Sequence, residues 1–497
     1  MITISTDSAK NKSIFLLMFI VLFVAILMGA GIGVGAYIFV APLALLIPAT
    51  YLLFRPAISV VIYVTFSLLV AGSLKYFFGL NIIQWVLSAI GLMILGYSLI
   101  KILFTVSKVH IPANGISQLI LLWWIVIIFT SVANLVSFSE WIVGLRIYLP
   151  VFGIFAYLAY CNPSERLIKG IFFFMMLTGS IQWIFSLYQH LEVMPIRIAL
   201  NYPGSPYDSV VGSFGGEKYG GGESGSLGIY LSIMIILSTA LFKFSQLKKA
   251  YFITLLLACL GGVALIESKV VILMIPVGLS LVYWDYLIKE PKKFLVGSAG
   301  VSGLMFGLLT LYYHLYWQAE SRLGLFDTII TRISYSFDPS FRSSSFSLGR
   351  IGSLEYWWDQ HSILDNPLTF LIGHGLASAV SHSSLIGSGN VVRDHVLKLD
   401  ETGASKLLWE SGLIGFFLFL LIFVFAFSRA SYLKKQLLLP VWHRAMMLGV
   451  QASMVLISVS IFYEVTAVSS PPMQLTSMFL LGYVAYWWRE INMAHCV

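Results

Sequence analysis

Apolar runs of about 20 residues recur along almost the whole 497-residue chain, and no other feature restricts its fold so strongly. Each run is long enough to cross about 30 Å of hydrocarbon as a helix. Hydrophobic residues make up 59% of the chain and charged residues only 10%, against roughly a quarter charged in soluble proteins. Because runs this continuous span a membrane only as helices, the sequence predicts an all-α polytopic membrane protein.

The runs predict about fourteen transmembrane helices. Their limits are 13-30, 34-54, 57-74, 82-105, 116-136, 141-160, 167-190, 225-243, 250-267, 270-288, 294-316, 406-428, 444-463 and 470-488. The first run lacks a small-x-small cleavage site, so we expect a retained helix and not a signal peptide. The chain then divides into 1-316 with helices 1 to 11 and an outer loop at 191-224, a large loop at 317-405, and 406-497 with helices 12 to 14.

Basic residues gather in every second connector, with Lys75 and Lys269 as the main exceptions. The positive-inside rule makes that side cytoplasmic, so both termini are expected in the cytoplasm and both long loops on the outer face of the membrane. The formal charge of +8 is dispersed over these connectors, which argues against a nucleic-acid partner and for the lipid bilayer.

The two outer loops differ in composition. The segment 191-224 is rich in glycine and acidic residues, which suits either a flexible linker or a loop that covers a ligand. The loop 317-405 is too long for a simple connector, and its aromatic residues favour folding. Within it, Ser347 to Gln360 is predicted to form a helix.

Ionisable residues in or beside the spans are the first candidates for a site, since they are costly in lipid. Arg146 lies inside a span, Lys269 lies in a tight outer turn, and Arg350 belongs to a basic series with Arg332, Arg322 and Arg342. Paired guanidinium hydrogen bonds suit a diphosphate at the outer surface. The alternatives are a snorkelling Arg146 and solvated charges elsewhere.

The end of the large loop carries a second group, Asp394, His395, Asp400 and Glu401, just before the span at 406-428. A carboxylate or imidazole here could take a proton from a sugar hydroxyl. Each of these residues could instead be an ordinary solvated loop group. No P-loop, GxSxG, HExxH or DxD-like motif is present, and the three cysteines have no metal-ligand spacing, so we expect no cofactor and no metal.

Four stretches together resemble the superfamily of O-antigen polymerases and O-antigen ligases, which includes exopolysaccharide repeat-unit polymerases. They are Asn134 to Tyr148 with GLRIY at 144-148, Gly212 to Ile229 followed by ESK at 267-269, GR at 349-350 followed by Trp357 and NPLTFLIGHGLAS at 366-378, and ESGLIG at 410-415. The stretches cover the region from about 134 to 430, and their order and spacing carry the likeness.

The resemblance implies a GT-C-like membrane glycosyltransferase that is metal-independent and uses a polyprenyl (undecaprenyl) diphosphate-linked oligosaccharide as donor. A hydroxyl of an acceptor glycan would attack the anomeric carbon. By the same resemblance Arg146, Lys269, Arg350 and Arg332 would bind the diphosphate and stabilise its developing charge. A chain-length regulator would be a further partner.

The general base stays open among three residues. Ligases of the family carry a histidine about eleven residues before the glycine of the GLIG stretch, and Glu401 occupies that place here, with His395 six residues earlier. Asp400 is the third candidate. A carboxylate favours the polymerase branch, whereas a shifted loop would restore His395 to the site.

Three functions therefore compete. The leading prediction is a polymerase that joins lipid-linked repeat units into a surface polysaccharide or exopolysaccharide. The first alternative is an O-antigen ligase that transfers finished glycan to the lipid A core. The second is a flippase of lipid-linked oligosaccharide, which would need two similar halves but no long outer loop.

Overall fold

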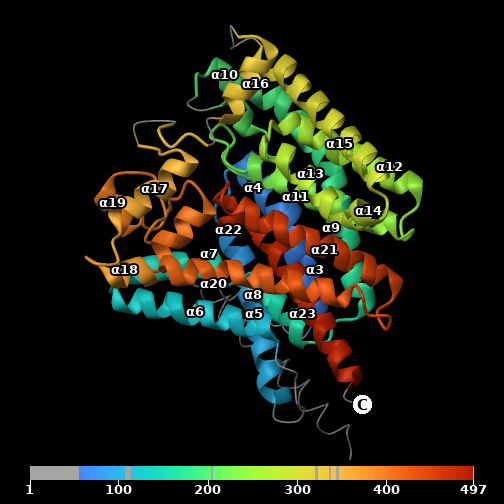
Figure 1. Ribbon diagram of the computed structural model, residues 1–497. Helices are drawn as coiled ribbons and strands as arrows, with labels where there is room; N and C mark the ends of the chain where they lie inside the picture. Colours follow the sequence, from blue (N-terminus) through green and yellow to red (C-terminus); the bar gives the residue numbers. More distant parts are fainter. Residues whose placement is uncertain are drawn as a thin grey trace, which may run out of the picture. The chain divides into compact units, whose positions relative to one another are not determined.

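The structure is a computed structural model that describes residues 55-106, 114-202, 205-318, 323-334, 337-342 and 346-495 (Figure 1). Within these residues every regular element is a helix, and extended segments form only isolated bridges. The runs predicted at 13-30 and 34-54, and Arg322 of the basic series, lie outside the described residues. Contacts divide the chain into two units, Met1–Ile62 and Tyr63–Val497, and all contacts below lie within the second unit.

Among the residues that the structure describes, eight helical segments are long and apolar enough to cross a membrane, which supports the prediction of a polytopic membrane protein. They are Pro56–Phe78 (α3, η1 and α4), Ile83–Phe104 (in α5, Ile83–Val106), Gly115–Ala133 (α6), Glu165–Ala199 (α9, η2 and α10), Ser224–Lys243 (α11), Lys249–Ile266 (α12), Pro291–Trp317 (α15 and η4) and Gly403–Leu433 (α20). The short η1, η2 and η4 segments are π-helical turns within these spans.

The other predicted runs form helices of different kinds. The run 141-160 is a pair, α7 (Phe138–Tyr148) and α8 (Phe152–Tyr160), bent by 49°. The run 270-288 is a 13-residue helix, α13 (Val270–Val282), followed by α14 (Trp284–Lys289). The last two runs correspond to α21 (Val441–Ser460) and α23 (Pro471–His495), joined through the short α22 (Thr466–Ser469).

Helix α11 forms the centre of the helical assembly. Its residues from Gly225 to Leu241 are buried on every face, which is the pattern expected of a span surrounded by other helices. It packs against α12, α13 and α21, while α12 also packs against α9 (Figure 1). A second group, α5, α8 and α23, and a third, α6 and α20, complete the packing.

The large loop is folded, as its aromatic content predicts. It contains α16 (Leu325–Ser334), α17 (Arg350–Gln360), α18 (Pro367–Ile372) and α19 (Asn390–His395). The predicted helix from Ser347 to Gln360 is confirmed, with its start at Arg350. Helices α17 and α18 pack against α20, so the loop rests on one end of the α6 and α20 pair (Figure 1).

Candidate functional site

Two glycines bring the third and fourth motif stretches into backbone contact. Gly373 (φ +78°) ends α18, and Gly412 (φ +62°, ψ −169°) interrupts the helical geometry of α20. A methyl group on Gly412 would lie 2.5 Å from the backbone nitrogen of Gly373, and one on Gly373 would lie 2.5 Å from that of Gly412. The amide groups of His374 and Gly375 donate to the carbonyls of Trp409 and Glu410, both at 2.8 Å. The GHG turn is thus docked on ESGLIG.

The C-terminal end of α6 holds the same turn from the other side. Thr130 Oγ1 donates to the carbonyl of Ile372 at 2.8 Å, and Asn134 Nδ2 donates to the carbonyl of Gly373 at 3.1 Å. Ser131 Oγ accepts from the amide of Leu376 at 2.9 Å. Asn134 opens the first motif stretch, so its side chain joins that stretch to the GHG turn.

A buried side-chain hydrogen bond joins the first and fourth stretches. Tyr148 Oη, at the end of α7, donates to Glu410 Oε2 at 2.6 Å, and both residues are buried. Lys406, also buried, lies 5.6 Å from the centroid of the Tyr148 ring. A charged group in this setting needs such partners, because an unpaired buried charge is costly. The arrangement fixes the bent α7 and α8 pair against α20.

Four cations act on one half-buried carboxyl, Asp208, in the 3₁₀ turn η3 (Pro206–Ser209). Burial raises the pKa of Asp208 above its ordinary value. The positive charges that oppose this rise belong to Arg197, Lys269, Arg350 and Lys398. We call these four residues the cation cluster. Lys269 and Arg350, two of the predicted diphosphate-binding residues, therefore act on the same group.

Lys269 is held at the tight turn between α12 and α13. Its ammonium lies 3.7 Å from a carboxylate oxygen of Glu267, and the Trp317 indole donates to the same oxygen at 2.6 Å. Burial raises the pKa of Glu267, whereas the charges of Lys269 and Arg332 lower it. Arg332, a further predicted diphosphate-binding residue, therefore borders this edge of the cation cluster.

Arg350 is held by the connection between α21 and α22. Its Nε donates to the carbonyl of Tyr463 at 2.8 Å, and its guanidinium lies 4.0 Å from the centroid of the Tyr463 ring. Loss of solvent around the half-buried Glu464 raises its pKa, while the charges of Arg350 and Lys398 lower it. The start of α17 and the C-terminal helices therefore share one charged region.

Arg146 lines a cavity that the other three predicted diphosphate-binding residues do not line. The cavity has a volume of about 100 Å³, and Gln84 and Glu223 also line it. The Arg146 guanidinium lies 4.9 Å from the centroid of the Trp85 ring. Burial raises the pKa of Glu223 to about 7, and the charge of Glu464 adds to that rise. The charge of Glu464 thus interacts with Glu223, which lines this cavity, and with Arg350 and Lys398 of the cation cluster.

The two predicted carboxylate bases face different partners. Glu401 accepts from Lys398 Nζ at 3.1 Å and from the hydroxyl of Ser347. Asp400 accepts from the hydroxyl of Ser381 and from its amide at 3.2 Å. Of the two, Glu401 is the one paired with a member of the cation cluster.

The third predicted base, His395, belongs to an aromatic group with two further histidines. Its Nδ1 lies 2.8 Å from Tyr356 Oη, and its ring packs 5.2 Å from Trp409. The Nε2 atoms of His361 and His374 lie 3.0 Å apart, and both rings also contact Trp409. Burial lowers the pKa of each histidine, for His374 to about 4. The imidazoles are therefore neutral near pH 7.

The sequence did not single out Arg197, Asp208, Lys398 or Glu464. The end of the run at 190 predicts a loop around Arg197, but the helix continues through Ala199 and buries its side chain. Asp208 lies in the outer loop 191-224 and Glu464 in a short connector between α21 and α22, and in both places a carboxylate is normally solvated. Within the described part of the chain, no three His, Cys, Asp or Glu side chains form a group that could hold a metal ion.

A scan against protein-family models and comparisons with curated proteins and with solved structures found no match to this chain. The family resemblance of the four stretches therefore stays a prediction.

Proposed function

We propose that this protein is a membrane glycosyltransferase that polymerises polyprenyl-diphosphate-linked oligosaccharide repeat units on the outer face of the bacterial cytoplasmic membrane. The proposal includes a GT-C-like architecture with about fourteen spans, cytoplasmic termini and a periplasmic loop 317-405. One observation carries it. The motif stretches that suggested the family are distant in sequence, yet direct backbone and side-chain contacts join the first, third and fourth of them.

The cation cluster supports a diphosphate ligand. Lys269 and Arg350 act together on Asp208, and they come from the second and third stretches. Preorganised cations stabilise negative charge as it develops in a transition state, and such stabilisation usually contributes more to the rate than any other single effect. In the proposed step an acceptor hydroxyl forms a bond to the anomeric carbon as the bond to the diphosphate oxygen breaks. The lipid diphosphate leaves with its charge balanced by the cluster.

The hydroxyl proton goes to the general base, for which Glu401 is the best supported candidate. Its carboxylate is paired with Lys398, so it lies beside the cations that would hold the leaving group. His395 is the alternative, because burial keeps its imidazole neutral and able to accept a proton. Asp400 is the least supported of the three, since its carboxylate is turned to Ser381.

The test uses purified protein in lipid with a lipid-diphosphate repeat unit as the single substrate. We expect the wild type to lengthen the glycan without added energy or metal, which a flippase would not do. Arg350→Ala should abolish lengthening, whereas Arg342→Ala, an exposed arginine of the same loop, should leave it intact. Product of wild-type length from Arg350→Ala would remove the diphosphate assignment. Arg146→Ala is expected to abolish lengthening as well.

A gene deletion separates the polymerase from the ligase. Loss of a polymerase leaves single repeats on an otherwise normal acceptor. Full-length chains that remain on the lipid carrier would contradict our proposal and identify a ligase.

A further inference from the structure

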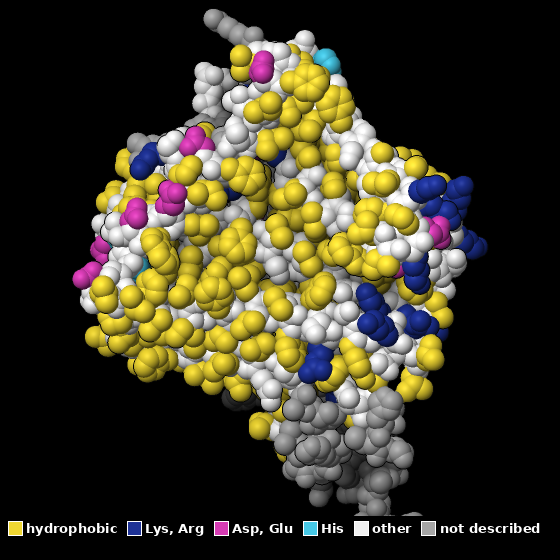
Figure 2. Space-filling model, viewed as in Figure 1, with side chains coloured by type: hydrophobic (Ala, Val, Ile, Leu, Met, Phe, Trp, Pro, Cys, Tyr) yellow, Lys and Arg dark blue, Asp and Glu magenta, His cyan; other side chains and the backbone are white. Residues whose placement is uncertain are grey.

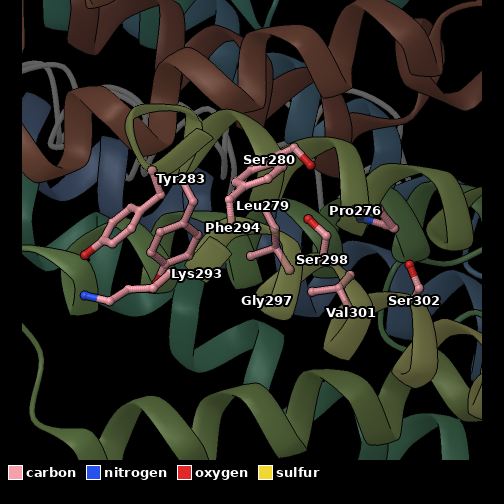
Figure 3. Close-up of a pocket in the computed structure, with 11 residues that line it drawn as sticks. Pro276, Leu279, Ser280, Tyr283, Lys293, Phe294, Gly297, Ser298, Val301 and Ser302 are labelled. Atoms are coloured by element: carbon pink, nitrogen blue, oxygen red, sulfur yellow. The ribbon is translucent and has the colours of Figure 1, made fainter. Parts of the chain in front are cut away.

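A cavity of about 490 Å³ lies between α13, α14 and α15, away from every residue assigned to the candidate site. Its volume falls within the range of about 300 to 1,000 Å³ that is typical of small-molecule sites. Figure 3 shows Lys293 and Tyr283 at one end and Pro276, Val301 and Ser302 toward the other. One end therefore carries an ammonium and phenols, and the rest of the lining is mainly apolar, with hydroxyls from Ser280, Ser298 and Ser302.

The apolar part of the cavity is formed by the facing sides of α13 and α15, which are not packed tightly against each other here. Leu279, Phe294 and Val301 line it, and the α15 wall is completed by Gly297 and Ser298. A side chain added at Gly297 would meet no atom within 4 Å. The outer side of α15 is exposed and apolar in a chain built of membrane spans. Hydrocarbon is the solvent expected at such a surface.

The polar end is held in place by Lys243. Its ammonium donates to the carbonyl of Val282 at 2.8 Å and pairs with Asp285. It also lies 5.3 Å from the Tyr283 ring centroid and 5.4 Å from that of Tyr286. Both phenols line the cavity. The cation thereby fixes two hydrogen-bonding side chains beside Lys293.

The surroundings of this end are basic. The neighbouring helix ends carry many more lysines than carboxylates, of which there are two, Asp285 and Glu290. The lysines are Lys243, Lys248, Lys249, Lys289, Lys292, Lys293, Lys434 and Lys435. Figure 2 shows Lys and Arg gathered on one side of the molecule, with Asp and Glu mostly on the opposite side. This is the side that the positive-inside rule predicts to be cytoplasmic. Basic pockets between membrane helices on that side suit anionic headgroups.

We propose that this cavity is a binding site for an anionic phospholipid of the cytoplasmic leaflet. Lys293 pairs with Glu290 in the structure, so the headgroup phosphate takes the place of that carboxylate and also accepts from the hydroxyls of Tyr283 and Tyr286, while an acyl chain lies along Leu279, Gly297 and Val301. The basic residues at one end favour an anionic headgroup over a zwitterionic one. The unfilled apolar wall accommodates an acyl chain. The site is independent of the proposed glycosyltransferase activity.

Two pairs of variants test the site. Gly297→Phe fills the cavity, whereas Gly300→Phe places the same side chain on α15 in open space outside it. Lys293→Gln removes the cation that lines the cavity, and Lys292→Gln removes its neighbour, which does not line it. All four variants are expected to unfold at the wild-type temperature in detergent, because a Cβ at either glycine position meets no atom within 4 Å and both lysines are exposed, where an ion pair contributes little.

The measurement is native mass spectrometry of the full chain titrated with phosphatidylglycerol or phosphatidylcholine. We expect the wild type to retain phosphatidylglycerol in preference, Gly297→Phe to lose it, and Lys293→Gln to bind it about fivefold more weakly. The Gly300→Phe and Lys292→Gln variants should bind like the wild type. Equal retention of the two lipids, or equal phosphatidylglycerol binding by both glycine variants, would overturn the proposal. A change of oligomeric state in both glycine variants with unchanged lipid binding would identify a helix as the occupant instead.

Discussion

Replacing Gly412 by alanine should be one of the most disruptive single-methyl changes in this protein. The new carbon would lie 2.5 Å from the backbone nitrogens of Ile372 and Gly373, about 0.9 Å inside ordinary van der Waals contact. Relief of that clash separates the two segments and lengthens the hydrogen bonds from His374 and Gly375 to α20. Two lost backbone bonds cost about 2 kcal/mol. A non-glycine residue at φ +62° and ψ −169° adds about 1 to 3 kcal/mol.

The matched control is Gly387→Ala. Gly387 has a φ of +68°, but a methyl group there would meet no atom within 4 Å. Thermal unfolding in detergent should place Gly412→Ala about 3 to 5 kcal/mol below the wild type and Gly387→Ala, which has only the strain of its positive φ, about 1 to 2 kcal/mol below it. Gly412→Ala should also abolish glycan lengthening. If the two variants lose the same stability, the reasoning from close backbone contact is wrong.

Two further predictions concern single buried groups. Tyr148→Phe leaves the buried Glu410 carboxyl without its 2.6 Å donor, so it should lower the free energy of unfolding by about 1 to 3 kcal/mol, whereas Tyr251→Phe on the exposed face of α12 should leave it unchanged. A smaller loss from Tyr148→Phe would show that the bond is not made. Burial lowers the pKa of His374 to about 4, below its ordinary value of 6.5. The neutral imidazole therefore contributes fully to the free energy of unfolding above pH 6.5, and this contribution, at most about 3 kcal/mol, is lost as the pH falls toward 4. His374→Asn should flatten the fall in melting temperature over that range, while the exposed His382→Asn should fall like the wild type, and identical curves for all three proteins would contradict the prediction.

The sequence was informative about the spans because their signal is local. A run such as 225-243 predicts its own helix, and α11 differs from that prediction by one residue. The run 141-160 predicts one straight helix, but the structure bends it between Tyr148 and Phe152, where Pro150 lacks a backbone donor. The helix predicted to end at 190 continues to Ala199, because the buried Gln189 amide is hydrogen-bonded: it donates to the carbonyl of Gly212 and accepts from the amides of Val211 and Gly212.

The candidate site was predicted in its motifs but not in its electrostatics. Arg350 and Lys269 stand out because a cation near lipid is costly. Nothing local distinguishes Asp208 or Glu464 from a solvated loop carboxylate. Only the packing of distant segments buries them beside those cations. Long-range contacts of this kind have no sequence signature in a single chain.

The contacts that join α6 and α7 to the later part of the chain also impose an order on biosynthesis. Thr130 is separated by 242 residues from Ile372, and Tyr148 by 262 residues from Glu410. At about 5 to 20 residues per second, a ribosome needs roughly 13 to 50 s to supply the missing partner. During that interval α6 and α7 are already inserted, but Thr130 and Tyr148 lack these hydrogen-bond partners. A nascent chain that stops before α18 leaves both groups without these partners, and membrane quality control could recognise such a chain as unfinished.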